Sequence, residues 1–121
     1  MIDLRPGVCH ALEEINGEDV YYNYPSNWGA LPVVSYYEVN NSDFAQADGK
    51  EYLSDIAFQV DIWSKDPDMN VEKSLLIDSR LALMGLRREF SHDLFESGSG
   101  LHHRTMRYGC IAKQNETIYQ K

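Results

Sequence analysis

The chain has 121 residues, of which 43% are hydrophobic and 25% charged, and this size and composition predict one globular domain over residues 1–121. Eleven Lys and Arg against 19 Asp and Glu give a net charge of −8, which disfavours specific nucleic-acid binding and anionic membranes. No apolar run approaches the roughly 18 residues that cross a bilayer, and MIDLRPG does not resemble a signal peptide. We therefore expect a soluble protein that is intracellular when made.

The first predicted element is an amphipathic helix over residues 5–15. Pro6 suits its first turn, and Asn16 and Gly17 supply a stop. Its apolar residues recur at helical spacing: Val8, Ala11, Leu12 and Ile15. Two strands follow, the tyrosine-rich segment DVYYNYP at residues 19–25 and VVSYYEV at residues 33–39. The second is apolar on both faces, which is typical of a strand covered on both sides.

The next segment, NNSDFAQADGKEY at residues 40–52, is polar, contains one glycine and has no sustained period. This composition predicts a long loop between two strands. Loops of this length in a compact domain are usually functional or disordered, so we expect it to contact a partner.

The strand after that loop carries the clearest pattern in the chain, FQVDIWS at residues 58–64. One set of alternating residues is wholly apolar and predicts the core face: Ile56, Phe58, Val60 and Ile62. The other set consists of Ala57, Gln59, Asp61 and Trp63. Packing within one protomer does not explain Asp61 and Trp63.

A second helix is predicted to begin near Pro67 and to run through VEKSLLIDSRLALMGLRREF, residues 71–90, with Arg87 and Arg88 at its negative end. Its expected inward stripe comprises Val71, Leu75, Ala82, Leu83 and Leu86. Four more apolar residues widen that stripe: Leu76, Ile77, Leu81 and Met84. We therefore expect this helix to touch more than its own sheet.

The remainder predicts closing strands. FSHDLFESGSG suggests a short strand and a glycine turn, HHRTMRYGCIAK a strand with Met106, Tyr108, Cys110 and Ala112 on one face, and ETIYQK an edge strand. The predicted fold class is α+β: a mostly antiparallel β-sheet with two α-helices packed on one face, in the order α-β-β-β-α-β(-β).

No group of residues in the sequence predicts an enzyme, a cofactor or a metal site. His102 and His103 are adjacent in a strand and should point to opposite faces, and Ser91, His92 and Asp93 are neighbours, a spacing that rarely gives triad geometry. The glycine turn lacks the lysine of a phosphate loop. Cys9 and Cys110 form no paired motif and are expected to be small buried apolar residues.

Large amphipathic side chains exceed what one small core needs: Tyr21, Tyr22, Tyr24, Trp28, Tyr36, Tyr37 and Trp63. Tyr and Trp concentrate in protein interfaces, which favours a permanent assembly of identical chains.

The strand FQVDIWSKD, the long helix after it and the late strand HHRTMRY together resemble the small tail-terminator or tail-completion proteins of tailed bacteriophages. The resemblance implies an α+β protomer, a hexameric ring that caps the tail tube, and a surface to which the head connector docks. In contractile particles the ring also holds the sheath protein. It further implies a location in the virion or a phage-tail-like particle, after assembly in the bacterial cytoplasm.

Three groups of site residues follow from this hypothesis. The expected contact with the tube is the polar loop, with Asp43, Phe44, Gln46, Asp48 and Lys50. The expected subunit interface comprises Trp28, Tyr36, Trp63, Leu76 and Met84. Acidic residues expected near the lumen or rim are Asp55 and Asp61, with Asp43, Asp48 and Glu51 as further candidates.

Other classes of protein stay open at this point. The chief rival is a small intracellular module that binds a peptide or small ligand with the Tyr- and Trp-rich loop near Trp28. A head-completion or connector protein and a small hydrolase are the remaining alternatives.

Overall fold

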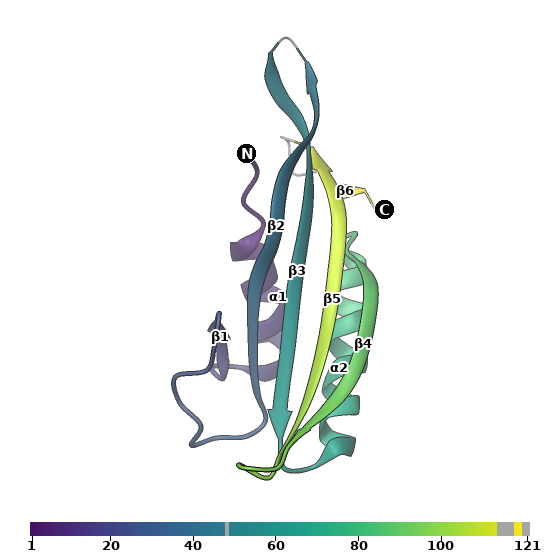
Figure 1. Cartoon of the computed structure of the whole chain (residues 1–121). Helices are drawn as coiled ribbons and strands as arrows, with labels where there is room; N and C mark the ends of the chain where they lie inside the picture. The colour runs from purple at the N-terminus through teal and green to yellow at the C-terminus, as the bar shows by residue number, and fades with distance from the viewer. Residues whose placement is uncertain (48, 114–117, 120–121) are drawn as a thin grey trace.

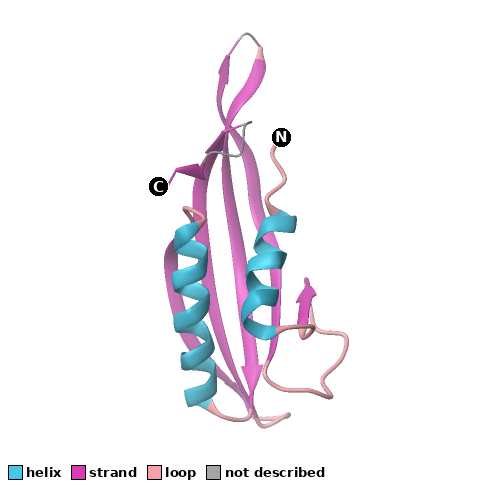
Figure 2. Ribbon diagram, turned by 180° about the vertical axis from the view of Figure 1, so that it is seen from behind, coloured by secondary structure: helices cyan, strands magenta, loops and turns pink. Residues whose placement is uncertain are grey.

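The computed structural model describes residues 1–47, 49–113 and 118–119. Two helices cover one face of a single six-stranded sheet (Figures 1 and 2), which confirms the predicted α+β class. The elements are α1 (Arg5–Asn16), β1 (Val20–Tyr22), β2 (Val33–Ala47), β3 (Lys50–Ser64), α2 (Pro67–Leu83), β4 (Arg87–Glu96), β5 (Leu101–Lys113) and β6 (Ile118–Tyr119). Neither helix in these described residues has the length and apolar character that a membrane span needs.

The strands lie in the order β1-β2-β3-β5-β4, and β6 pairs with the far end of β5. The short β1 runs parallel to β2, and every other pairing is antiparallel. The edge strand predicted in ETIYQK is therefore present as β6. The face of the sheet opposite the helices, which we call the open face, looks toward the viewer in Figure 1.

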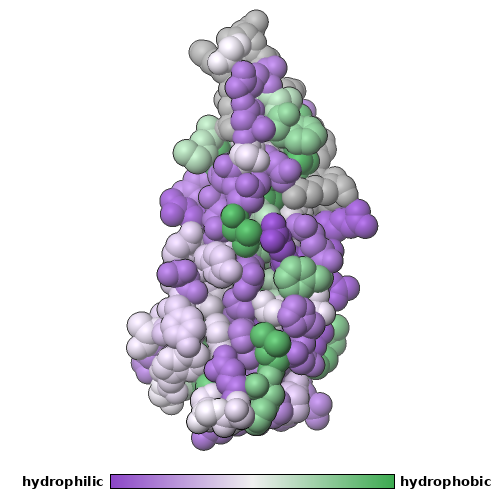
Figure 3. All heavy atoms as spheres, in the orientation of Figure 1, coloured by the Kyte–Doolittle hydropathy of each residue, from purple (hydrophilic) through white to green (hydrophobic). Residues whose placement is uncertain are grey.

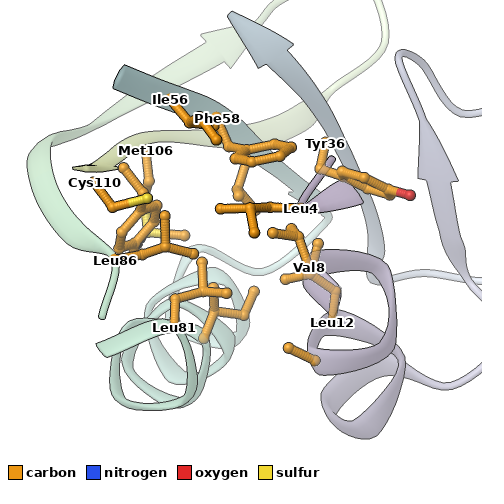
Figure 4. Packing of buried hydrophobic residues seen from close by; sticks show 14 of the residues in the cluster. Leu4, Val8, Leu12, Tyr36, Ile56, Phe58, Leu81, Leu86, Met106 and Cys110 are labelled. Carbon is orange, nitrogen blue, oxygen red and sulfur yellow. Dashed lines mark hydrogen bonds between the residues drawn. The ribbon is translucent and has the colours of Figure 1, made fainter. Parts of the chain in front are cut away.

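The core lies between the sheet and the two helices (Figure 4). The predicted inward residues of β3 and β5 are all buried there: Ile56, Phe58, Val60, Ile62, Met106, Tyr108, Cys110 and Ala112. Helix α1 contributes Val8, Ala11 and Leu12, as its spacing predicted. Tyr108 Oη donates a hydrogen bond of 2.8 Å to Asp78 Oδ1 of α2, and burial together with this bond raises the pKa of Tyr108.

Helix α2 begins as predicted and ends earlier than predicted. Asp66 caps it by accepting a 2.9 Å hydrogen bond from the Asp68 backbone N–H, and Pro67 occupies the first turn. The chain leaves the helix after Leu83, and Gly85 adopts a φ of 86°. Arg87 and Arg88 therefore begin β4 and do not end the helix, which corrects the predicted range of 71–90.

The buried stripe of α2 is also different from the predicted one. Its buried residues are Asn70, Ser74, Ile77 and Leu81, of which the last two belong to the predicted apolar set. The predicted inward residues Val71, Leu75, Ala82 and Leu83 are exposed, and Leu86 is buried as predicted but lies beyond the helix. Asn70 can be buried because its Nδ2 donates to the His102 carbonyl at 2.9 Å and its Oδ1 lies 2.8 Å from Ser64 Oγ. A polar side chain with hydrogen-bond partners thus lies on the buried face of α2, where the sequence pattern predicted only apolar residues.

The predicted loop at residues 40–52 is instead a continuation of β2 and β3 into a long hairpin. The described pairing of β5 with β3 ends at Leu53 and Lys113, so the hairpin extends past the body of the sheet (Figure 1). We call residues 44–52 the arm. Register shifts at Val39 and Phe44 interrupt the alternation, and the described part of the arm lies beyond the ends of both helices (Figure 2). The period-two pattern that identifies a strand is therefore absent from its sequence.

Candidate functional site

Trp63 is buried on the open face, although no helix covers that face. Its ring stacks on His103 with centroids 4.3 Å apart and an interplanar angle of 19°. The loop between β1 and β2 brings Tyr24 and Trp28 over it in edge-to-face contacts at 5.7 and 5.4 Å. Trp63 Nε1 donates to Glu96 Oε1 at 3.2 Å. Trp63 is thus 3% exposed, and its burial needs no second protomer.

Asp61 lies beside this aromatic cluster and is 4% exposed. Its Oδ1 is 2.8 Å from His103 Nε2, and Gln59 Nε2 donates to its Oδ2 at 3.2 Å. The other imidazole nitrogen, Nδ1, lies 3.5 Å from Glu96 Oε1. The His103 ring therefore sits between two carboxylates and is held flat against Trp63. His103 and Gln59 thus supply partners for the buried Asp61 carboxylate, and Trp63 and His103 hold Glu96 in place.

These contacts correct the expectation that a neighbouring subunit or a pore sees Asp61 and Trp63. Tyr36 is corrected in the same way, because it lies in the core beside α1. Burial, together with a hydrogen bond to Cys9, raises the pKa of Tyr36. Met84 is partly buried and packs against the core as well. Of the predicted interface residues, Trp28 remains half-buried and Leu76 exposed.

A pocket of about 380 Å³ opens beside the aromatic cluster, at the end of the sheet away from the arm. Its walls combine aromatic and aliphatic side chains with three polar groups: Tyr24, Trp28, Leu31, Leu101, Lys65, Glu96 and Ser99. Glu96 is already engaged by Trp63 and His103. Lys65 is exposed at the rim, so the pocket offers an apolar wall and one accessible cation.

The outer side of α2 carries a second exposed apolar area, which we call the α2 surface. It comprises Val71, Leu75, Leu76 and Leu83. Leu83 is 84% exposed and Leu75 is 64% exposed. Single exposed apolar residues are ordinary, but four on one helix make this side of α2 a candidate interaction surface. Glu72 and Ser79, also exposed, lie among them on the helix.

The arm, together with Asp43 just before it, carries the residues predicted to contact the tube. Phe44 is 58% exposed, and Gln46 Nε2 donates a hydrogen bond to Asp43 nearby. Asp48 and the side chain of Lys50 lie outside the described residues. Asp55, predicted near the lumen, is half-buried on the open face opposite Ser42 and Ile111.

The remaining histidines do not assemble a catalytic group. Ser91, His92 and Asp93 alternate between the two faces of β4; His92 stacks on Phe90 at 5.4 Å, and Asp93 accepts a 2.9 Å bond from Arg104. Among the described residues, no three His, Cys, Asp or Glu side chains lie close enough together to bind a metal ion. Both cysteines are free, with Cys110 buried and Cys9 half-buried.

Sequence reasoning missed the roles of Glu96 and His103. The alternation of β5 places His103 on the same face as Thr105 and Arg107, but only the register with β3 brings it beside Trp63.

No protein-family model matches the chain, and no curated protein matches it either.

Proposed function

We propose that this chain is a structural assembly protein of a phage tail or phage-tail-like particle, and specifically a tail terminator. Copies of it would form a ring that caps the tail tube and presents the surface for head joining. The observation that carries the proposal is the α2 surface: a lone protomer leaves Val71, Leu75, Leu76 and Leu83 in water. The three segments that carry the resemblance, FQVDIWSKD, the helix after it and HHRTMRY, correspond to β3, α2 and β5.

The arm is the proposed contact with the tube. It projects beyond the sheet, and Phe44 is an exposed apolar residue within a polar segment. Asp43, Gln46, Asp48 and Lys50 would supply polar contacts around it. Further partners are the head connector and, in a contractile particle, the sheath protein. Asp55 stays a proposed rim residue, where negative charge would suppress contacts with passing DNA.

Electron microscopy of the purified chain mixed with tail tubes tests this function. We expect rings at the tube ends and an arrest of tube growth. Deleting residues 45–49 should leave a folded protein that no longer caps tubes, because the hairpin can close again below the deleted tip. Phe44→Ala should weaken capping, whereas Phe95→Ala, which truncates an equally exposed phenylalanine on β4, should not. Normal capping by the deletion variant would show that the arm does not contact the tube.

A second candidate is a module that binds a peptide or small ligand in the pocket beside Trp28. The pocket volume of about 380 Å³ and its aromatic wall favour this candidate. A chain that stays monomeric at high concentration, and whose tryptophan fluorescence changes on addition of a peptide library but not in a Trp28→Leu variant, would support the module over the terminator.

A further inference from the structure

The open face carries a row of side chains along β4, in which the apolar Phe90 and Leu94 alternate with His92 and lead to Glu96 at the pocket. Leu94 and Phe90 are exposed and lie on the same face as His103 and Arg107, with which they pair in register. The pocket residues Trp28 and Leu101 lie on the same face, at the end of the sheet away from the arm. Figure 3 shows the open face, where hydrophobic areas stand apart among hydrophilic ones. The helices cover the opposite face, so this row and the α2 surface lie on opposite sides of the protomer (Figures 1 and 2).

The two apolar areas match in length. Val71 and Leu83 are 12 residues apart in a helix, which corresponds to about 18 Å at 1.5 Å per residue. Phe90 and Glu96 are six residues apart in a strand, which corresponds to about 20 Å at 3.3 Å per residue. A helix laid along β4 would therefore cover the row from Phe90 to the pocket.

The two areas also match in charge. Lys65 stands at the rim of the pocket, and Glu72 lies within the α2 surface. Both are exposed, and within the described part of the chain neither has an ion-pair partner. Glu96, the other charged residue at the pocket, accepts a hydrogen bond from Trp63 and lies beside His103. These contacts reduce its repulsion of an incoming carboxylate.

We propose that the α2 surface of one copy docks on the open face of the next copy, over β4 and the Trp28 pocket, with Glu72 against Lys65. The occupant is a second copy of this chain because one sequence supplies both halves, which agree in length, apolar character and charge. The contact is heterologous, since it joins two different faces, and its repetition produces a closed ring or a filament. This interface deepens the proposed function by naming the two surfaces that join the subunits.

Charge reversal tests the pairing directly. Lys65→Glu and Glu72→Lys each place like charges together, and we expect each to weaken assembly at least tenfold in native mass spectrometry or sedimentation velocity. The double variant restores the opposite charges in exchanged positions and should recover assembly. Glu18→Lys, an equal change of charge at an exposed site between α1 and β1, is the matched control and should assemble normally. Failure of the double variant to recover would overturn the pairing.

Disulfide cross-linking tests the orientation, in a Cys9→Ser background that leaves only the buried Cys110. Ser79→Cys on α2 and His92→Cys on β4, each about two thirds of the way along its surface from the pocket end, should give a dimer when the two single variants are mixed. A chain with both substitutions should give a ladder that ends at the ring size, whereas efficient cross-linking of Ser79→Cys to itself would overturn the heterologous arrangement. Rings that form and cap tubes without these cross-links would refute this interface alone. Cross-linked rings that do not cap tubes would refute the terminator function alone.

Discussion

The two faces of β3 are both buried, but different kinds of interaction bury them. On the helix-covered face, Ile56, Phe58, Val60 and Ile62 pack against aliphatic side chains of α1 and α2. On the open face, Asp61 and Trp63 are shielded by a loop, a histidine and a carboxylate, all from the same sheet or its connections.

The difference between the faces shows where further binding can occur. The helix layer leaves no gap over Phe58, which is 0% exposed. The loop and the β4–β5 turn, by contrast, leave a pocket of about 380 Å³ directly beside the buried Trp63. The helix-covered face therefore supplies stability, while the open face supplies both stability and a surface that can accept another chain.

Phe58→Ala should have the largest effect, because it leaves a cavity under a complete helix layer. We expect a loss of about 4–5 kcal/mol in the free energy of unfolding, measured by urea denaturation. Phe44→Ala, which truncates an exposed phenylalanine, should change that free energy by no more than about 0.5 kcal/mol. A small effect of Phe58→Ala would mean that the helices do not cover this strand closely.

Trp63→Ala should destabilise the protomer by about 3–4 kcal/mol, since the indole is buried and hydrogen-bonded. A loss of this size is typical of a core residue, and not of the subunit interface in which the sequence analysis placed Trp63. Trp28→Ala is the matched comparison and should cost less stability because Trp28 is only half-buried. If the Trp63→Ala protomer unfolded at the same temperature as the unsubstituted protomer, the indole would lie at a subunit boundary and not in the fold.

Asp61→Asn tests the polar part of the open-face cluster. The amide keeps the shape of the side chain but removes the charge beside His103, and we expect a loss of about 1–2 kcal/mol in the free energy of unfolding at neutral pH. Asp93→Asn is the control, because Asp93 pairs with Arg104 at an exposed position. Equal effects of the two substitutions would show that burial of Asp61 does not strengthen its interactions.

The smallest expected effect concerns the exposed contact between α1 and α2. A hydrogen bond from Arg80 lowers the pKa of Glu14 below its ordinary value. The stabilisation is therefore complete above the ordinary glutamate pKa and is lost as the pH falls through the lowered value. Glu14→Gln should reduce the thermal midpoint slightly at pH 7 and lose that difference in acid, whereas Glu13→Gln should show neither effect. If the change in thermal midpoint caused by Glu14→Gln were the same at pH 7 and in acid, the ion pair with Arg80 would not be its cause.

Much of the fold could be predicted from the sequence, because the alternation through Phe58 and the spacing through Val8 and Leu12 are local patterns. The inward side of α2 could not be predicted, since apolar residues occur all around that helix. Its buried face includes Asn70, whose hydrogen bonds go to residues distant in the sequence. The contact of Trp63 with His103 depends on the register of strands 40 residues apart in the chain. The open-face cluster therefore required the structure, whereas the core did not.

The position of β5 has a consequence for how the chain folds. It lies between β3 and β4, yet it follows both of them in sequence. During synthesis β4 emerges first and has no described strand partner other than β5. Phe90, Leu94 and Phe95 then stand on an unpaired strand until β5 inserts. Between translation of β4 and translation of β5, the main-chain groups of β4 therefore form an unpaired strand edge, which is a site at which a nascent chain can aggregate.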